Sequence, residues 1–329
     1  MISKQRILPL GMNIELTTVC PLHCPQCYCS LERGKHIPYE TAAKYIRQAK
    51  AFGIKHVELS GGETLCYPYL FELIHLAHEV GLEVNIAISG WHFDEICLNK
   101  LIQSGVSNIF VSLNGPTEQI NRLTRDGYYY AISALELLQR KSFPNVYLNW
   151  VMHHNNADYL PEMIKLVQKY SVRAIVILAL KPTSKHELNT LPTFQQMQNV
   201  AQIIKDTPHG RILVESCYSP LLALVRDTKL LGNLNTGRFM GCGAGRNLLN
   251  INVHGKISPC RHLDYFEQWD SLEEYWTKSP ILQKIRTLED NKREPCRSCK
   301  YSNYCRHCLA INSKLNNDLY IGNDLCPLA

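Results

Sequence analysis

The chain has 329 residues, of which 45% are hydrophobic and 19% charged, and it contains 14 cysteines. A chain of this length can bury a large core without covalent staples, which excludes the class of small disulfide-stabilised proteins. The net charge of +6 comes from basic residues scattered over most of the sequence, so it does not indicate a surface that follows nucleic-acid phosphates.

The first eleven residues contain neither a long apolar segment nor a small-residue cleavage site, and no apolar run approaches a length of roughly eighteen residues. We therefore expect a cytoplasmic protein with reduced thiols and no membrane association. In that compartment a dense group of cysteines favours metal binding or redox chemistry over disulfide formation.

Short apolar runs typical of strands alternate with longer runs typical of helices up to about residue 206. The helical runs at 39–53, 69–81 and 95–105 carry apolar residues at i, i+3 and i+4, and each ends at a glycine. Strand-like runs occupy 12–17, 56–60, 83–89, 108–114, 146–152 and 173–180. Six strand–helix units in succession predict an α/β fold with a parallel sheet, a partial (β/α)6 barrel over 1–206 with functional loops after the strands.

The alternation stops after residue 206, and the remainder is rich in short turns and cysteines. We expect a bridging segment over 207–241 and a small cysteine-rich iron–sulfur domain over 242–329. Metal rather than a large core would hold this domain together.

Four cysteines lie within ten positions directly after the first expected strand. Cys20, Cys24 and Cys27 have the spacing Cys-x3-Cys-x2-Cys. Three thiolates on one loop can hold three irons of a 4Fe-4S cube and leave the fourth iron open to another ligand. A zinc site closed by His23 or Cys29 is the alternative that the spacing leaves open.

This loop and the Gly-Gly-Glu element at 61–63, after the second expected strand, resemble the radical S-adenosylmethionine (SAM) family. The resemblance implies a 4Fe-4S cluster on the three loop cysteines and contacts from Gly61, Gly62 and Glu63 to the amino group of the SAM methionine. Gln26, where many members have an aromatic residue, and Thr64, where proline is frequent, depart from the family pattern.

The segment 111–128 resembles the family's fourth-strand region. By that resemblance Ser112 and Asn114 are candidate contacts of the SAM ribose, and Arg125 is a candidate bidentate partner of its carboxylate. The residue types alone also suit turn formation at a strand end and a solvated arginine.

The C-terminal cysteines resemble the SPASM extension of radical SAM enzymes, which carries two auxiliary iron–sulfur clusters. They follow the pattern Cys242-x12-Gly255-x4-Cys260, Cys296-x2-Cys299-x5-Cys305-x2-Cys308 and then Cys326. The family's usual spacing before the fourth cysteine of the block is x3, whereas this chain has x2. A structural zinc ribbon competes as an interpretation of the two Cys-x2-Cys pairs.

The resemblance implies three 4Fe-4S clusters, one binding SAM and two auxiliary. The first auxiliary cluster would take Cys242, Cys260 and Cys308, and the second Cys296, Cys299, Cys305 and Cys326. Two cubes need one more ligand than these seven cysteines supply. The first auxiliary cluster would therefore keep an open iron or recruit another residue.

In function, the resemblance implies an enzyme in which a 5′-deoxyadenosyl radical from SAM abstracts hydrogen from a substrate carbon. The subclass implies a residue of a ribosomally made peptide as the target, modified by a crosslink, a thioether or epimerisation. The alternatives are protein side-chain oxidation as in sulfatase maturases, cofactor maturation as in pyrroloquinoline-quinone biosynthesis, nucleic-acid modification, and a non-catalytic metal-binding protein.

The expected partners are a peptide or small-protein substrate and a flavodoxin- or ferredoxin-like electron donor. Only nineteen residues precede Cys20, too few for the leader-binding domain of many such enzymes. We therefore also expect a separate leader-binding protein or a substrate with a short tail.

Cys217 lies where the strand–helix alternation ends. Three roles are open to it: a packed thiol, the missing ligand of the first auxiliary cluster, or a catalytic hydrogen-atom donor that quenches a substrate radical, as an epimerase requires.

Overall fold

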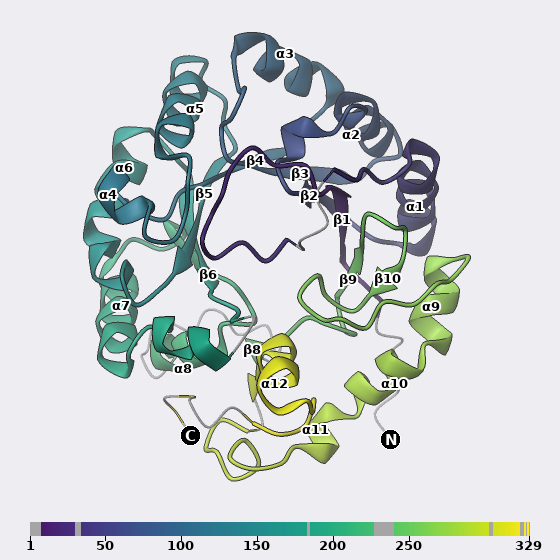
Figure 1. Ribbon diagram of the computed structural model, residues 1–329, viewed down its shortest axis with the longest axis vertical. Helices are drawn as coiled ribbons and strands as arrows, with labels where there is room; N and C mark the ends of the chain where they lie inside the picture. The colour runs from purple at the N-terminus through teal and green to yellow at the C-terminus, as the bar shows by residue number, and fades with distance from the viewer. Residues whose placement is uncertain are drawn as a thin grey trace.

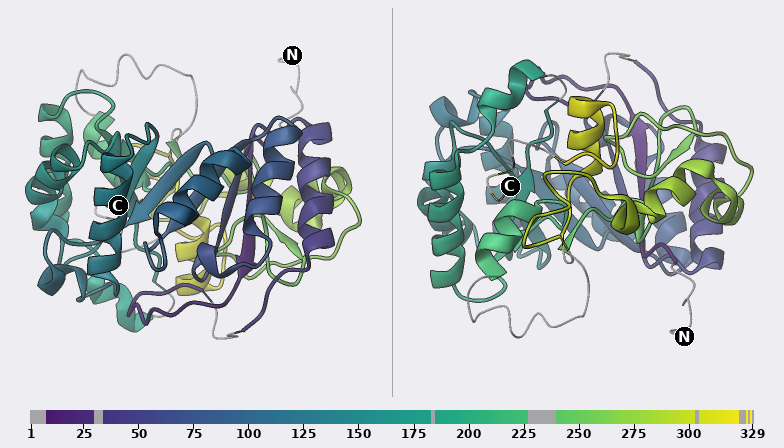
Figure 2. Two further views of the ribbon diagram at one scale, coloured as in Figure 1. Left: turned by 90° about the horizontal axis from the view of Figure 1, so that it is seen from above. Right: turned by 90° about the horizontal axis from the view of Figure 1, so that it is seen from below.

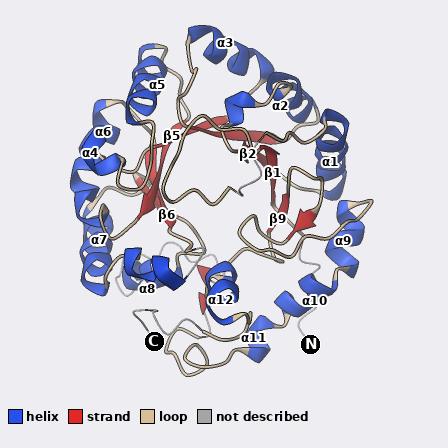
Figure 3. Ribbon diagram, viewed as in Figure 1, coloured by secondary structure: helices blue, strands red, loops and turns tan. Residues whose placement is uncertain are grey.

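The computed structural model describes residues 8–29, 34–182, 185–226, 240–302 and 305–322, together with 326 and 328. Within these residues, nine strands form one sheet in the order β10-β9-β1-β2-β3-β4-β5-β6-β7, and β8 pairs separately with β11. The sheet curves around the middle of the molecule and carries helices on its outer side (Figure 1, Figure 3). The predicted α/β fold with a partial barrel is confirmed.

The six predicted strands form where the apolar runs indicated, and each pairs in parallel with the next. They are β1 (Gly11–Thr17), β2 (His56–Gly61), β3 (Glu83–Ile88), β4 (Asn108–Ser112), β5 (Val146–Met152) and β6 (Ala174–Ala179). Alternate side chains of these strands, such as Ile14, Leu59 and Ile109, are fully buried in the main hydrophobic core. Strand periodicity therefore set both the position of each strand and its buried face.

Helices connect these strands and pack on the outside of the sheet (Figure 3). They are α1 (Tyr39–Phe52), α2 (Leu70–Glu79), α3 (Glu95–Ser104), the single turn α4 (Glu118–Asn121), α5 (Tyr128–Arg140), α6 (Leu160–Lys169) and α7 (Phe194–Asp206). Gly53 and Gly105 end α1 and α3 in the left-handed conformation that glycine tolerates. No helix in the described part of the chain combines the length and the apolar character that a bilayer span requires.

The sheet extends beyond the six predicted strands at both edges. Strand β7 (Ile212–Val214) joins β6, β9 (Leu248–Ile251) pairs in parallel with β1, and β10 (Ile257–Ser258) pairs antiparallel with β9. These strands are too short to be recognised from periodicity, and β9 and β10 come from the region expected to form the cysteine-rich domain. The division at 206 and 242 stays a prediction.

The C-terminal region has a second, smaller core of its own. The remaining elements of this region are α8 (Ser219–Arg226), β8 (Met240–Gly241), α9 (Leu272–Lys278), α10 (Pro280–Arg286), α11 (Leu288–Asn291), β11 (Cys305–Arg306) and α12 (Leu309–Asn316). Of these, α10, α11 and α12 contribute buried residues to the small core, whereas those of α9 belong to the main core. Seen from below, α12 lies between α8 on one side and α9–α10 on the other (Figure 2). The C-terminal region thus spans the gap between the two edges of the sheet. The buried guanidinium of Arg306 donates to the carbonyls of Cys242, Ala244 and Ile285 and ties these segments together.

Candidate active site and cluster sites

The cysteine loop follows β1 and crosses the middle of the curved sheet (Figure 1). Cys20 and Cys24 are half-buried and Cys27 is exposed. Burial raises the pKa of the Cys20 thiol, and the nearby Glu63, Cys24 and Cys27 raise it further. The structure therefore brings the three predicted cluster cysteines together on one loop with their thiols close enough to interact.

The Gly-Gly-Glu element is hydrogen bonded to this loop through the backbone. The Gly62 amide donates to the Thr17 carbonyl at 2.6 Å, and the Glu63 amide donates to the Val19 carbonyl at 2.8 Å. A Cβ atom on Gly62 would overlap the Val19 carbonyl oxygen and press on Cys20. Glycine at this position thus permits the close approach of the two loops.

Glu63 is 2% exposed, and both of its carboxylate oxygens accept hydrogen bonds. One oxygen accepts from the Ser89 amide at 2.9 Å and from the Ser89 hydroxyl, and the other accepts from the Leu65 amide at 3.3 Å. Burial raises the pKa of Glu63, and the bonds from Ser89 oppose that rise. A carboxylate has about four lone-pair sites, so these bonds leave acceptor capacity for a ligand ammonium group.

Ser89 was missed by the sequence analysis. It lies directly after β3, and it was treated only as the last residue of an apolar run. The signal available in the sequence was a polar residue at the carboxyl end of a parallel strand, where functional side chains gather.

Arg125 and Ser112 come together near Glu63. The Arg125 Nε donates to the Ser112 carbonyl at 3.1 Å, and the positive charge of Arg125 opposes part of the rise that burial causes in the pKa of Glu63. Asn114 is placed differently, because its side-chain amide donates to Thr124 and accepts from the Val151 amide inside the protein. The roles of Ser112, Asn114 and Arg125 toward SAM stay predictions.

A cavity of about 740 Å³ opens on the inner side of the sheet, against the cysteine loop. Cys27 and Gly61 line it from the loops after β1 and β2, Lys181 lines it from the segment after β6, and Arg261 and His262 line it from the segment after β10. A cavity lined by the Cys27 thiol and by Gly61, two residues before the buried Glu63, fits a 4Fe-4S cluster with SAM as the ligand of its open iron.

Two charged residues of the cavity wall were not recognised in the sequence. Glu15 belongs to β1, and burial raises its pKa to about 7, with the positive charge of Arg261 opposing the rise. Arg261 follows Cys260 and donates to the Tyr28 hydroxyl at 2.9 Å and to Glu58 at 2.8 Å. Since Tyr28 follows Cys27, this bond connects the loop of the SAM cluster to the loop of an auxiliary cysteine.

The cysteines expected to bind the first auxiliary cluster lie together in the small C-terminal core. Cys242 and Cys308 are buried there and Cys260 packs against them. The Cys242 thiol accepts from the amides of Ala244 and Leu309, and the Cys260 thiol accepts from the His262 amide. Backbone amides directed at sulfur stabilise thiolates, which are the form that binds iron.

The shorter spacing before Cys308 does not displace it from this group. Strand β11 pairs in parallel with β8, and the Cys242 amide donates to the Arg306 carbonyl at 3.0 Å. Cys308 then occupies the N-cap position of α12. A hydrogen bond with Cys217 is the largest effect that lowers the pKa of Cys308, to about 7.

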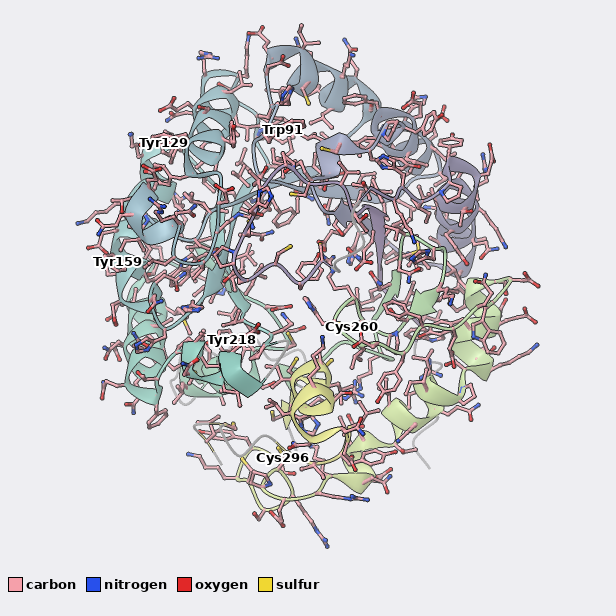
Figure 4. The ribbon with its side chains drawn as sticks, viewed as in Figure 1. Trp91, Tyr129, Tyr159, Tyr218, Cys260 and Cys296 are labelled. Carbon is pink, nitrogen blue, oxygen red and sulfur yellow. The ribbon has the colours of Figure 1, made fainter. Side chains whose placement is uncertain are left out.

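The cysteines expected to bind the second auxiliary cluster line a smaller cavity of about 100 Å³, which Cys217 and Cys308 also line: they are Cys296, Cys299, Cys305 and Cys326. Figure 4 shows Cys296 at the lower edge of the molecule and Cys260 nearer its middle. Among the described residues, no three His, Cys, Asp or Glu side chains are arranged to hold a single metal ion. The ligand assignments for both auxiliary clusters stay predictions.

Two family models match the chain. The radical SAM superfamily model matches residues 14–167, and the SPASM model, described as an iron–sulfur cluster-binding domain, matches residues 242–300. These two segments contain the cysteine loop and the start of the auxiliary cysteine region.

Similar proteins include a PqqA peptide cyclase of Gluconobacter oxydans, which is 27% identical over 89% of this chain and 83% of its own length. Streptococcus suis SuiB bound to its precursor peptide SuiA has a TM-score of 0.78 at 17% identity, covering 97% of this chain and 76% of that one. The structure of anSMEcpe with AdoMet and the Cp18Cys peptide has a TM-score of 0.75 at 17% identity, covering 97% and 94%. The two structures share the fold of this chain.

Proposed function

We propose that this chain, which is a radical SAM enzyme with a SPASM domain, modifies a residue of a ribosomally made peptide. When bound to its 4Fe-4S cluster and reduced, SAM supplies the radical that removes hydrogen from a substrate carbon. The observation that carries the proposal is the 740 Å³ cavity, which is lined by residues of both the cysteine loop and the auxiliary-cysteine region.

Different residues around this cavity would bind the cluster, SAM and the peptide. The cysteine loop holds the cluster, and Glu63 orients the amino group of SAM through a carboxylate held in place by Ser89. Arg261 and His262 line the same cavity as Cys27, so a peptide entering it would contact residues of both the cysteine loop and the auxiliary region. This enclosure positions the substrate carbon and limits access of water.

Among the expected modifications, a ring-forming crosslink within the peptide has the strongest support. The similarity to a PqqA peptide cyclase, at 27% identity over 89% of the chain, favours it over epimerisation. We further propose a flavodoxin- or ferredoxin-like protein as the electron donor and two auxiliary 4Fe-4S clusters beside the SAM-binding one.

The test uses anaerobically reconstituted enzyme, reductant, SAM and a peptide encoded beside its gene. A crosslink would lower the peptide mass by two hydrogen atoms, whereas epimerisation in deuterated water would add one deuterium without another change. Formation of 5′-deoxyadenosine without any change in the peptides tested would count against those peptides, and absence of 5′-deoxyadenosine would overturn the proposed chemistry.

A further inference from the structure

We propose that Cys217 is the fourth protein ligand of the first auxiliary cluster, so that this cluster is closed by four cysteines. The four thiols would be those of Cys217, Cys242, Cys260 and Cys308. The inference concerns iron binding in the resting enzyme and does not depend on which substrate the enzyme modifies.

The position of Cys217 supports this role directly. It follows β7, is 9% exposed, and belongs to the same small core as Cys242 and Cys308. Its side chain is hydrogen bonded to the Cys308 thiol, while Cys308 interacts electrostatically with Cys242 and Cys260. The fold therefore gathers four thiols from four separate segments of the chain, which is the number of ligands that a complete 4Fe-4S cube takes.

The surroundings of Cys217 are also too polar for a thiol that serves only to fill space. The Lys181 ammonium lies 2.8 Å and 3.0 Å from the two oxygens of Glu215, and this pair stands beside Cys217. Lys181 also interacts electrostatically with Cys308 and Cys260. A cation at this place offsets the negative charge that buried thiolates and their cluster would carry.

The same geometry argues against Cys217 as a hydrogen donor to the substrate. Among the described residues that line the 740 Å³ cavity, Lys181 is present and Cys217 is not. Cys217 instead lines the smaller cavity beside Cys308 and the second set of cluster cysteines. A donor must face the substrate carbon, whereas a ligand must face the other thiols, and Cys217 does the latter.

Ligation exchanges a sulfur–hydrogen bond for a sulfur–iron bond, and the released proton passes to solvent as the cluster assembles. Four cysteine thiolates then occupy all four irons. The first auxiliary cluster would have no open iron, so a sulfur atom of the substrate would not bind there.

The test uses the full chain with Cys20, Cys24 and Cys27 changed to alanine, which removes the open iron of the SAM-binding cluster from the measurement. This parent is expected to keep about eight irons, four for each auxiliary cube. Adding Cys217→Ala should lower the count by at least one iron and produce a three-iron electron paramagnetic resonance (EPR) signal after mild oxidation. Cys97→Ala, on α3 and outside both thiol sets, is the matched control and should change neither.

A second measurement is made on the parent itself and so remains valid if Cys217→Ala folds poorly. Added thiol or cyanide should leave the EPR spectrum of the reduced parent unchanged, because no iron is open. A shift already in the parent, or unchanged iron and EPR in Cys217→Ala, would overturn the proposal. In the enzyme that keeps Cys20, Cys24 and Cys27, a Cys217→Ala variant with unchanged iron content that no longer incorporates deuterium into product would overturn the proposal and assign Cys217 as the hydrogen donor.

Discussion

The cysteine loop and the C-terminal core both present groups of cysteines for iron binding, but they position those cysteines in different ways. The three cysteines of the cysteine loop come from eight consecutive residues, and one of them, the exposed Cys27, lines an open cavity. The first auxiliary group comes from separate segments, and Cys217, Cys242 and Cys308 in it are buried in a core of their own. The contrast teaches that an iron meant to bind a ligand is held on an open loop, whereas a closed cluster is built into a core.

The difference extends to what surrounds the sulfur atoms. Beside the SAM loop lies a buried carboxylate, Glu63, suited to an incoming ammonium group. Beside the auxiliary thiols lies a cation, Lys181, suited to the negative charge of the cluster. The hydrogen bond from Arg261 to Tyr28 joins the two regions.

The largest expected effect comes from removing the cysteines of the loop while leaving those of the auxiliary region unchanged. Changing Cys20, Cys24 and Cys27 together to alanine should remove about four of about twelve irons and abolish SAM cleavage, while the auxiliary clusters remain. Iron analysis, EPR and an assay for 5′-deoxyadenosine measure this. Loss of all iron would show that the auxiliary region does not assemble independently, and tightly bound zinc without sulfide would contradict the cluster assignment.

The next prediction concerns the charge beside the auxiliary thiols. Lys181→Met would leave Glu215 without its counter-ion, and we expect the free energy of unfolding to fall by about 2–3 kcal/mol, because the Lys181 side chain is only 9% exposed. Thermal unfolding of the reconstituted enzyme measures the change, and adding Glu215→Gln should restore part of the loss.

Lys278→Met is the matched control for this variant. Lys278 pairs with Glu274 at the same distance of 2.8 Å, but both side chains are exposed, so the loss should stay below about 1 kcal/mol. Equal losses for the two variants would mean that the position of Lys181 beside the thiols has no special energetic role.

On the SAM side, Glu63→Ala should weaken SAM binding by about 10- to 100-fold and leave the iron content intact, because a charge-assisted hydrogen bond is lost while no cluster ligand is changed. Equilibrium dialysis with SAM measures the affinity. Glu83→Ala, at the exposed start of β3, serves as the control and should bind SAM normally. Unchanged affinity in Glu63→Ala would refute the assignment of the Gly-Gly-Glu element.

The smallest effect tests the residue that supports Glu63. Ser89→Ala removes the hydroxyl that donates to the Glu63 carboxylate, so the pKa of Glu63, already raised by burial, should rise further. SAM binding requires the ionised carboxylate and is lost as the pH falls through this pKa, so in the variant the loss should begin at a higher pH. Near neutral pH we expect an affinity decrease of up to about tenfold.

The measurement is the affinity for SAM of Ser89→Ala and of a control variant, each determined across the pH range in which Glu63 titrates. Thr64→Val is the control, because the Thr64 hydroxyl donates to the Ala87 carbonyl at 2.7 Å and not to the carboxylate. A pH profile for Ser89→Ala that coincides with that of the control would show that Ser89 does not tune Glu63.

Much of the barrel was predictable because its signals are local. The six strands and the helix ends at Gly53 and Gly105 follow from side-chain periodicity and from the left-handed conformation of glycine. The strands β7, β9 and β10 were missed, because each has only two to four residues and is stabilised by a neighbour far away in the chain.

The sequence by itself determined the cysteine loop, the Gly-Gly-Glu element and the family, since each is defined by spacing along a short segment. Only the tertiary structure decided that Ser89 holds Glu63, that Arg261 bonds to Tyr28, and that Cys217 contacts Cys308. These contacts join residues 26, 233 and 91 positions apart. Periodicity and motif spacing describe only neighbours along the chain, whereas the closing of the sheet and the packing of the C-terminal core decide which distant side chains meet.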